Sequence, residues 1–482
     1  MKKLILTSLL SLTFIHFMYA EDGPNVWSAS LTSAGQIWAI AVNPVTQSTI
    51  YAGSFTTGIW KSTNTGLNWV QMNSGLTNLN VQTMAISNSN PNVLYCGTSQ
   101  AGTGAGIYKS TNAGVNWTQI NSGIVETSIG VQSIAISPVN PDIAYVAIFD
   151  GLTDSQQGVY KTTNGGTNWN VSNTGIGTIK NILTIVINPL NPNVVYCGTS
   201  FSVLLNTGPS RIYKSVNAGG TWTEASTGLP SLATDNKPVR CLSISRADTS
   251  LALAGLFLNT DSLSGMYVTT NGGGLWTRRH TGLPNIVGTL PRSCLIRPGS
   301  TSEFYVGLGN AANTAPLGVF RTTNAGLSWT DFNGGTLPNT TSIRTLNFRT
   351  TTDSTLYAGG AHPTLATGQG LFEYSWIVTG IGNQNGNLPE EFLLKQNYPN
   401  PFNPTTKISY QLSSTSNVRL VVYDINGREI SVLVNEKQNA GNYEINFDSR
   451  NTKQGSQFSS GVYFYRLTAG DFSEVKTMML VK

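Results

Sequence analysis

The chain has 482 residues, of which 50 are glycine and only 11% are charged, and its formal net charge is +5. This length allows two or more domains, and this composition favours tightly turned β structure over helical bundles. The basic residues are spread along the chain without dense runs, which argues against nucleic acid as a partner.

The first twenty residues have the order of a secretory signal peptide. Two lysines begin the chain, an apolar run extends from Leu4 to Met18, and Ala20 precedes two acidic residues. The apolar run is shorter than the roughly 20 residues that a membrane-spanning helix needs. We expect a signal peptide at 1–20 that is cleaved after Ala20, with an uncleaved anchor as the alternative, and no transmembrane segment in the mature chain.

A short box recurs six times at intervals of about 50 residues, the length of a four-stranded propeller blade. It reads Ser or Thr, any residue, Asn, any residue, Gly, two residues of any kind, and Trp, and a further Gly follows six residues after each Trp. The Asn and Trp positions are Asn64 and Trp69, Asn112 and Trp117, Asn164 and Trp169, Asn217 and Trp222, Asn271 and Trp276, and Asn324 and Trp329.

A second repeat, a strand pair with an Asn/Pro turn, precedes each box and occurs seven times. Its last copy runs from Ile343 to Ala361 and is followed by a third strand, Gly370 to Tyr374, but by no box. We expect the segment around Trp27 to supply the missing strand, so that residues 25–30 pair with residues 370–375. The predicted fold of residues 21–376 is therefore an all-β, seven-bladed β-propeller closed on its own N-terminal segment, without exposed sheet edges.

The box resembles the Asp-box, or BNR, repeat of sialidases, sortilin-type receptors, xyloglucan-specific glucanases and photosystem assembly propellers. Here Asn stands at every Asp position, and Thr replaces Ser at Thr162, Thr269 and Thr322. Hydroxyl and amide oxygens both accept backbone N–H bonds in a tight turn, Gly allows positive φ, and Trp fills the gap between sheets. We interpret the boxes as structural elements.

Residues 377–387 read as a flexible Gly/Asn-rich linker, and 388–482 as a small Ig-like antiparallel β-sandwich. This last segment contains YPNPFNPTT, YDINGRE, AGNYEINFD and SGVYFYRL. It resembles the type A sorting domain of the type IX secretion system of Bacteroidetes-like bacteria. The resemblance implies recognition by the outer-membrane secretion machinery, with Gly461, Tyr463 and Lys482 in the sorting signal. The protein is then secreted or held at the outer face of the outer membrane. An ordinary Ig-like adhesion module is the alternative.

Aligning the seven strand pairs places one residue of each at an equivalent position near the start of the innermost strand. These residues are Trp38, Gln82, Gln132, Leu183, Arg240, Arg292 and Arg344. Three arginines on consecutive blades favour an anionic partner, because guanidinium binds carboxylate or phosphate with two hydrogen bonds. Trp38 could stack on a sugar ring. We therefore expect an extracellular ligand such as an acidic glycan or a peptide carboxylate; alternatively, the arginines bond to loop carbonyls or to Asp235 and stiffen the rim.

The resemblance also raises an enzymatic reading, a xyloglucanase- or sialidase-like glycoside hydrolase. The Phe/Tyr-Arg-Ile-Pro signature of sialidases is absent, and the acids Asp150, Asp235 and Asp261 form no recognisable pair of the kind that glycoside hydrolysis requires. We favour a binding module and assign no catalytic residue. No cofactor and no metal site are expected, because His280 and His362 have no His or Cys at metal-ligand spacing.

Two further sets of residues carry expectations. A second basic row is predicted to be a solvated face; it consists of Lys61, Lys109, Lys161, Lys214 and Arg321. Cys96 and Cys197 are expected to be buried thiols. Cys241 and Cys294 lie on neighbouring blades, so a disulfide bridge is conceivable. Their strand positions differ by one, however, so their side chains are expected to point in opposite directions.

Overall fold

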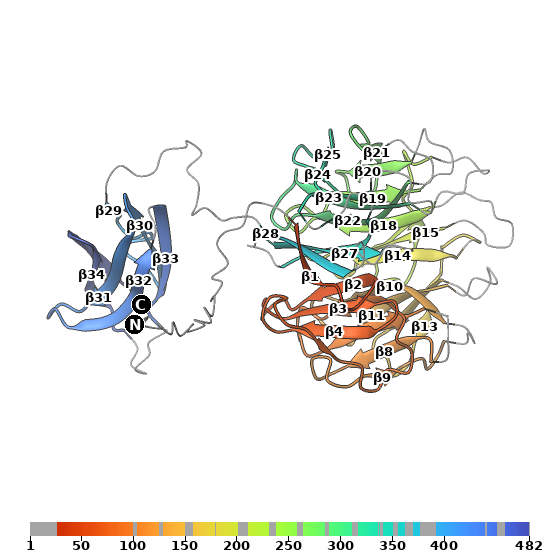
Figure 1. Ribbon diagram of the computed structural model, residues 1–482, viewed down its shortest axis with the longest axis horizontal. Coiled ribbons are helices and arrows are strands. Elements are labelled where there is room, and N and C mark those ends of the chain that lie inside the picture. The colour runs from red at the N-terminus through yellow and green to blue at the C-terminus, as the bar shows by residue number, and fades with distance from the viewer. Residues whose placement is uncertain are drawn as a thin grey trace, which may run out of the picture. The chain divides into compact units, whose positions relative to one another are not determined.

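The computed structural model of the chain contains two compact units, Met1–Trp376 and Ile377–Lys482, and all the regular structure that it describes is β-strand (Figure 1). It describes residues 27–99, 104–124, 129–149, 158–178, 180–200, 211–230, 238–257, 264–284, 289–310, 317–335, 337, 341–349, 355–361, 370–375, 392–438, 441–450 and 458–481. The predicted signal peptide and linker lie outside these residues, as do Asp150, Asp235, Asp261, His362 and Lys482. No helix in the described ranges is long and apolar enough to span a membrane.

The first unit consists of seven four-stranded antiparallel sheets, the blades of a propeller. Blades one to three are β2 (Ile37–Val42), β3 (Ile50–Ser54), β4 (Gly58–Ser62) and β5 (Val70–Gln71); β6 (Val81–Ile86), β7 (Leu94–Thr98), β8 (Ile107–Ser110) and β9 (Thr118–Gln119); and β10 (Gly130–Ile136), β11 (Ala144–Phe149), β12 (Gly158–Thr162) and β13 (Asn170–Val171). Blades four to six are β14 (Ile182–Ile187), β15 (Val195–Thr199), β16 (Ile212–Ser215) and β17 (Thr223–Glu224); β18 (Val239–Ile244), β19 (Ala252–Leu256), β20 (Gly265–Thr269) and β21 (Thr277–Arg278); and β22 (Thr289–Ile296), β23 (Phe304–Asn310), β24 (Gly318–Thr322) and β25 (Thr330–Asp331).

The seventh blade joins the two ends of the propeller segment. It contains β26 (Ser342–Phe348), β27 (Thr355–Ala361), β28 (Gly370–Ser375) and, from the N-terminal side, β1 (Trp27–Leu31). Trp27 lies opposite Tyr374 in an antiparallel register. The innermost strands β26 and β2 are also in contact, as are the innermost strands of all other consecutive blades. The predicted closure is therefore confirmed, and the ring has seven blades.

The boxes form tight turns between the third and fourth strands. In the first box, the Gly66 N–H donates to Ser62 Oγ and the Asn68 N–H donates to Asn64 Oδ1, each at 2.9 Å. The other five boxes repeat this pattern, and the Gly of each box has positive φ. Asn supplies the acceptor that the turn needs without adding a charge to it.

Tryptophans and glycines lock each blade onto the one before it. The indole N–H of five box tryptophans donates to a backbone carbonyl of the preceding blade, and Trp27 does the same in the seventh blade; the acceptors are Met72, Ile120, Ser172, Ala225, Arg279 and Phe332. Trp69 instead donates to Gly66 of its own box. The Gly six residues after each box Trp lies so close to the Trp carbonyl of the next blade that a Cβ would overlap it, and Gly335 has the same relation to Trp27. Trp27 thus replaces the missing seventh box Trp.

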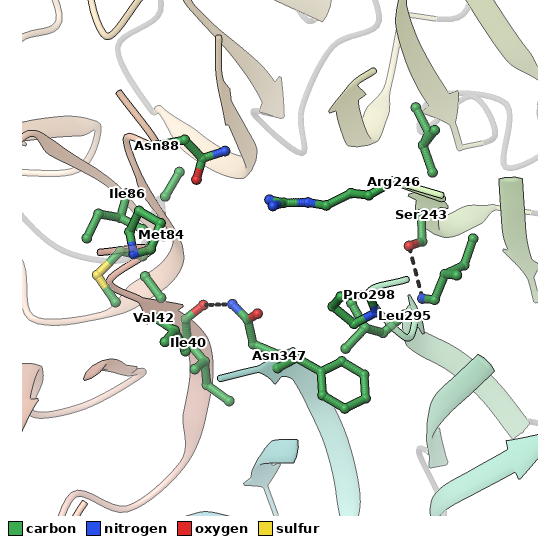
Figure 2. Close-up of a pocket in the computed structure, with 16 residues that line it drawn as sticks. Ile40, Val42, Met84, Ile86, Asn88, Ser243, Arg246, Leu295, Pro298 and Asn347 are labelled. Atoms are coloured by element: carbon green, nitrogen blue, oxygen red, sulfur yellow. Dashed lines mark hydrogen bonds between the residues drawn. The ribbon is translucent and has the colours of Figure 1, made fainter. Parts of the chain in front are cut away.

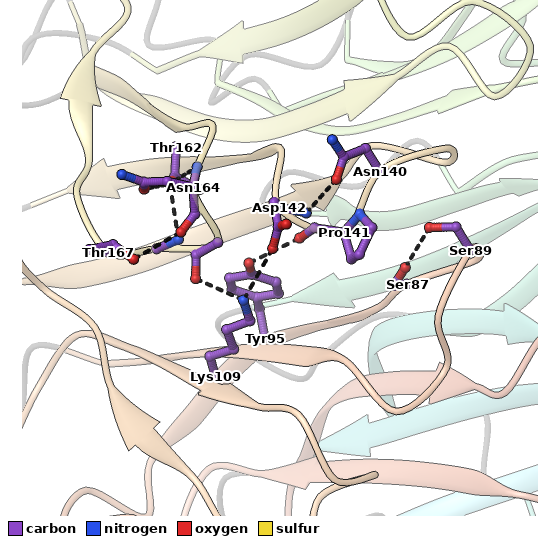
Figure 3. Close-up of polar contacts among 12 residues, drawn as sticks. Ser87, Ser89, Tyr95, Lys109, Asn140, Pro141, Asp142, Thr162, Asn164 and Thr167 are labelled. Carbon is purple, nitrogen blue, oxygen red and sulfur yellow. Dashed lines mark hydrogen bonds and ion pairs between the residues drawn. The ribbon is translucent and has the colours of Figure 1, made fainter.

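The four lysines of the second basic row also join neighbouring blades, and Arg321 forms an ion pair within its own blade, which contradicts the prediction of a solvated face. Lys109 Nζ donates to the Gly165 carbonyl of the next box at 2.9 Å, lies above the Tyr95 ring and is 3.6 Å from Asp142 (Figure 3). The other three lysines repeat the carbonyl and ring contacts, and Arg321 pairs with Glu303. The prediction was wrong because the next box presents a backbone carbonyl to each lysine, and periodicity alone does not reveal that acceptor.

All four cysteines are free and buried. Cys96 and Cys197 are thus buried thiols, as expected. Cys241 and Cys294 do not point away from each other, because both side chains are buried in one apolar cluster that blades five and six share. The expectation was wrong because opposite faces of consecutive blades face one another, so side chains one strand position apart meet between the sheets.

The second unit is the predicted antiparallel sandwich. One sheet contains β29 (Leu393–Leu394), β30 (Thr405–Leu412) and β33 (Gly441–Asp448), and the other contains β31 (Ser416–Tyr423), β32 (Glu429–Gln438), β34 (Gly461–Ala469) and β35 (Phe472–Leu480). Their inner faces share one apolar core. Of the sorting-signal residues, Gly461 begins β34, and the Tyr463 hydroxyl donates to the Ser459 carbonyl at 2.8 Å.

Candidate functional site

Every innermost strand contains one β-bulge at the same place. The register shifts at one residue in each of β2, β6, β10, β14, β18, β22 and β26, and the unpaired residue is the one that the repeat alignment singles out. A bulge adds a residue that has no partner on the neighbouring strand and redirects its side chain. The seven bulged residues are Trp38, Gln82, Gln132, Leu183, Arg240, Arg292 and Arg344, which we call the axial ring.

The axial ring encloses a hollow of about 120 Å³, and these seven are the residues that line it in the part of the chain that the structure describes. All seven side chains are half-buried. Gln82 Nε2 donates to Gln132 Oε1 at 2.7 Å, so the two glutamines form a polar pair between blades two and three. The structure therefore brings together every residue of the equivalent position in the seven repeats, which come from parts of the sequence more than 300 residues apart.

The three arginines of the axial ring are positive charges without a counter-ion among the described residues. The Nε atoms of Arg240, Arg292 and Arg344 are buried and have no hydrogen-bond partner, and no carboxylate lines the hollow. Burial, together with the neighbouring Arg344 and Arg240 guanidinium groups, lowers the pKa of Arg292 to about 8. Burial likewise lowers the pKa of Arg344 to about 10. The axial ring therefore holds positive charges that are poorly solvated and have no counter-ion among the described residues. A bound anion would neutralise them.

Trp38 does not offer a free ring face. The Phe55 ring is stacked on Trp38 at 3.9 Å, and the Arg344 guanidinium carbon lies 4.1 Å from the Trp38 ring centroid. Because a planar ring has only two faces, these contacts leave no room for a sugar to stack. Trp38 instead holds Arg344 by a cation–π interaction, contrary to the expectation that it stacks on a ligand.

The sequence left two alternatives to ligand binding, namely bracing of the rim by the arginines and glycoside hydrolysis. Asp235, the acid proposed to neutralise the arginines, lies outside the described residues, as do Asp150 and Asp261, the other acids considered for hydrolysis. Loop carbonyls do not satisfy the three Nε atoms in the part of the chain that the structure describes. Within the described ranges, no hydrogen bond to these Nε atoms makes the arginines simple braces of the rim.

A second, larger cavity lies along the same innermost strands, beyond the axial ring. It has a volume of about 360 Å³ and is lined by the later residues of β2, β6, β18, β22 and β26 and by turns that follow them (Figure 2). The sequence analysis did not find it. Its one cationic residue is Arg246, which occupies the turn position that is Pro44 in blade one, so an alignment of these turns would have singled it out.

These features define the class of protein: a closed seven-bladed propeller with a positively charged axial site, followed by a separate β-sandwich. Residues 396–482 match the family model described as a secretion system C-terminal sorting domain. The match confirms the prediction of a sorting domain, and the protein is accordingly secreted and attached to the cell surface. No curated protein matches the sequence.

Solved structures resemble the chain in fold. A crystal structure of an ancestral GH74 enzyme has a TM-score of 0.54 and 19% sequence identity, over 92% of this chain and 60% of that enzyme. The chain thus spans 60% of the enzyme's length. YCF48 from Cyanidioschyzon merolae has a TM-score of 0.47 and 13% identity, over 73% of this chain and 98% of YCF48. PorZ, a surface component of the type-IX secretion system of Porphyromonas gingivalis, has a TM-score of 0.39 and 14% identity, over 92% of this chain and 51% of PorZ.

Proposed function

We propose that the propeller is a binding module that takes an anionic group, a carboxylate or phosphate of an extracellular ligand such as an acidic glycan, into the axial ring. The observation that carries this proposal is the set of three converging arginines whose buried Nε atoms lack partners. A hollow of about 120 Å³ has the volume of about four water molecules. It accommodates the charged group only, so the rest of the ligand lies over the mouth of the ring.

The same residues favour binding over hydrolysis. Glycoside hydrolysis requires two carboxylates flanking the scissile bond. Among the residues that the structure describes, those that line the axial ring and the larger cavity include no Asp or Glu. Guanidinium groups orient and hold an anion, which suits a receptor for acidic ligands.

The experiment is a calorimetric titration of the full chain with galacturonate oligosaccharides, using neutral oligosaccharides of equal length as the control ligand. We expect Arg292→Gln and Arg344→Gln each to weaken binding by about 10- to 100-fold, since each removes a charged hydrogen bond. Arg211→Gln is the matched control, because it removes the same charge from a surface pair with Glu224. Equal affinity for neutral ligands, or full affinity in both ring variants, contradicts the proposal. Release of reducing ends supports the hydrolase instead.

We also propose that the six boxes are Asn variants of the Asp-box repeat. In support, a Ser or Thr hydroxyl and an Asn oxygen accept backbone N–H bonds in every box. An Asp carboxylate would accept the same bonds.

A further inference from the structure

The larger cavity has the size and the lining of a small-molecule site. Its volume of about 360 Å³ falls within the roughly 300–1,000 Å³ of typical ligand pockets, whereas the axial ring is much smaller. Ile40, Met84, Ile86 and Leu295 are among the apolar side chains that form its walls (Figure 2). Such walls favour an apolar body that displaces water from them.

Arg246 places a positive charge at this apolar cavity. Its side chain is exposed and extends across the cavity towards the side on which Asn88 lies (Figure 2). Asp248, the nearest acid in sequence, accepts hydrogen bonds from the Ser250 hydroxyl and backbone N–H at 2.6 and 2.9 Å. No ion pair to Arg246 occurs among the described residues, and no acid lines the cavity. Arg246, the one charged residue of the lining in the described ranges, therefore favours an anionic group on the ligand.

The cavity opens to solvent at the end where Arg246 and Asn88 lie, because both side chains are exposed there. The side chain of Asn347 is tied to β2, since its Nδ2 donates to the Ile40 carbonyl at 3.1 Å. Ser243 likewise accepts the Ile296 N–H at 3.3 Å. The cavity thus has apolar walls in its interior and the Arg246 guanidinium at its opening.

We infer that this cavity binds an amphipathic monocarboxylate, with the apolar body among the strands and the carboxylate on Arg246. The inference is independent of the proposed function, because the two sites share no residue. Two kinds of ligand have an apolar body and one carboxylate: a free small acid such as a medium-chain fatty acid, and a peptide chain that ends in an apolar residue.

The test is a calorimetric titration of the full chain with four probes. Octanoate represents the free acid, an acetylated peptide ending in leucine represents the chain end, and octanol and the peptide amide are their uncharged counterparts. We expect at least one acid to bind at least about tenfold more tightly than its counterpart, as a charged hydrogen bond predicts. Binding by octanoate identifies the free acid as the source, and binding by the peptide acid alone identifies the chain end.

Two variants locate the site. Arg246→Gln is expected to remove the preference for the acid, and Ile86→Trp, which fills the cavity with a larger side chain, is expected to remove binding of acid and counterpart alike. Arg211→Gln removes an equal charge elsewhere and should leave both unchanged. The inference is overturned if no acid binds at about 10 mM, if acid and counterpart bind equally, or if Arg246→Gln keeps the preference.

Discussion

Replacing Arg292 with methionine is expected to stabilise the ligand-free protein. The pKa of Arg292 is near 8 in place of the ordinary 12.5. This shift means that the fold disfavours the charged guanidinium by a free energy of about 6 kcal/mol. Water at the half-buried ring reduces this penalty, and replacements of buried charges by apolar residues of similar size give gains of about 1–4 kcal/mol. We therefore expect Arg292→Met to raise the free energy of unfolding by about 1–3 kcal/mol at pH 7.

Equilibrium unfolding in urea, followed by tryptophan fluorescence, measures this change with and without the acidic oligosaccharide. Because the ligand supplies the missing negative charge, it should stabilise the native protein but not the variant, and so reduce or reverse the difference. Arg211→Met is the control, since this arginine, unlike Arg292, has a carboxylate partner in Glu224. A loss of more than about 1 kcal/mol in ligand-free Arg292→Met would refute the reasoning, because Arg292 would then be a structural tie.

Two further predictions concern the fold. Gly175→Ala should lower the free energy of unfolding in urea by at least about 1–3 kcal/mol more than Gly299→Ala does. Both glycines have positive φ, but only at Gly175 would an added Cβ overlap the Trp222 carbonyl oxygen. Equal losses in the two variants would contradict this packing argument. Burial and the Arg278 charge lower the pKa of His280 to about 4 from 6.5, so the neutral ring contributes stability that is present above pH 6.5 and is lost as the pH falls towards 4. The urea midpoint should decline across this window less steeply in His280→Gln than in the native protein, and parallel curves would exclude His280 as the cause.

The propeller architecture could be predicted because the same two motifs, the strand pair and the box, recur along the sequence. Six blades carry the same turn acceptors and the same Trp, and the one incomplete repeat could be completed only by the segment around Trp27. The equivalent positions of the axial ring also follow from the alignment. The bulge that redirects these residues, however, is a backbone feature that leaves no mark in residue type.

The remaining features depend on contacts between blades. The basic row was misassigned because the acceptor for Lys109 is a backbone carbonyl of the next blade, which no side-chain pattern reports. The role of Trp38 was misjudged because Phe55 and Arg344 cover its ring. The larger cavity was missed because the volume left between strands is set by several unrelated side chains and has no motif of its own.

The mixed origin of the seventh blade has a consequence for how the protein folds. Trp27 and Tyr374 pair across almost the whole length of the propeller segment, so the most distant partners of the unit must meet before the last sheet is complete. Such non-local pairing slows folding, because chain entropy is lost before the contact is gained. Until that meeting, β28 has an open edge and β1 has no partner strand. A chain shortened before Gly370 would leave β1 and β27 with open edges and would tend to self-associate.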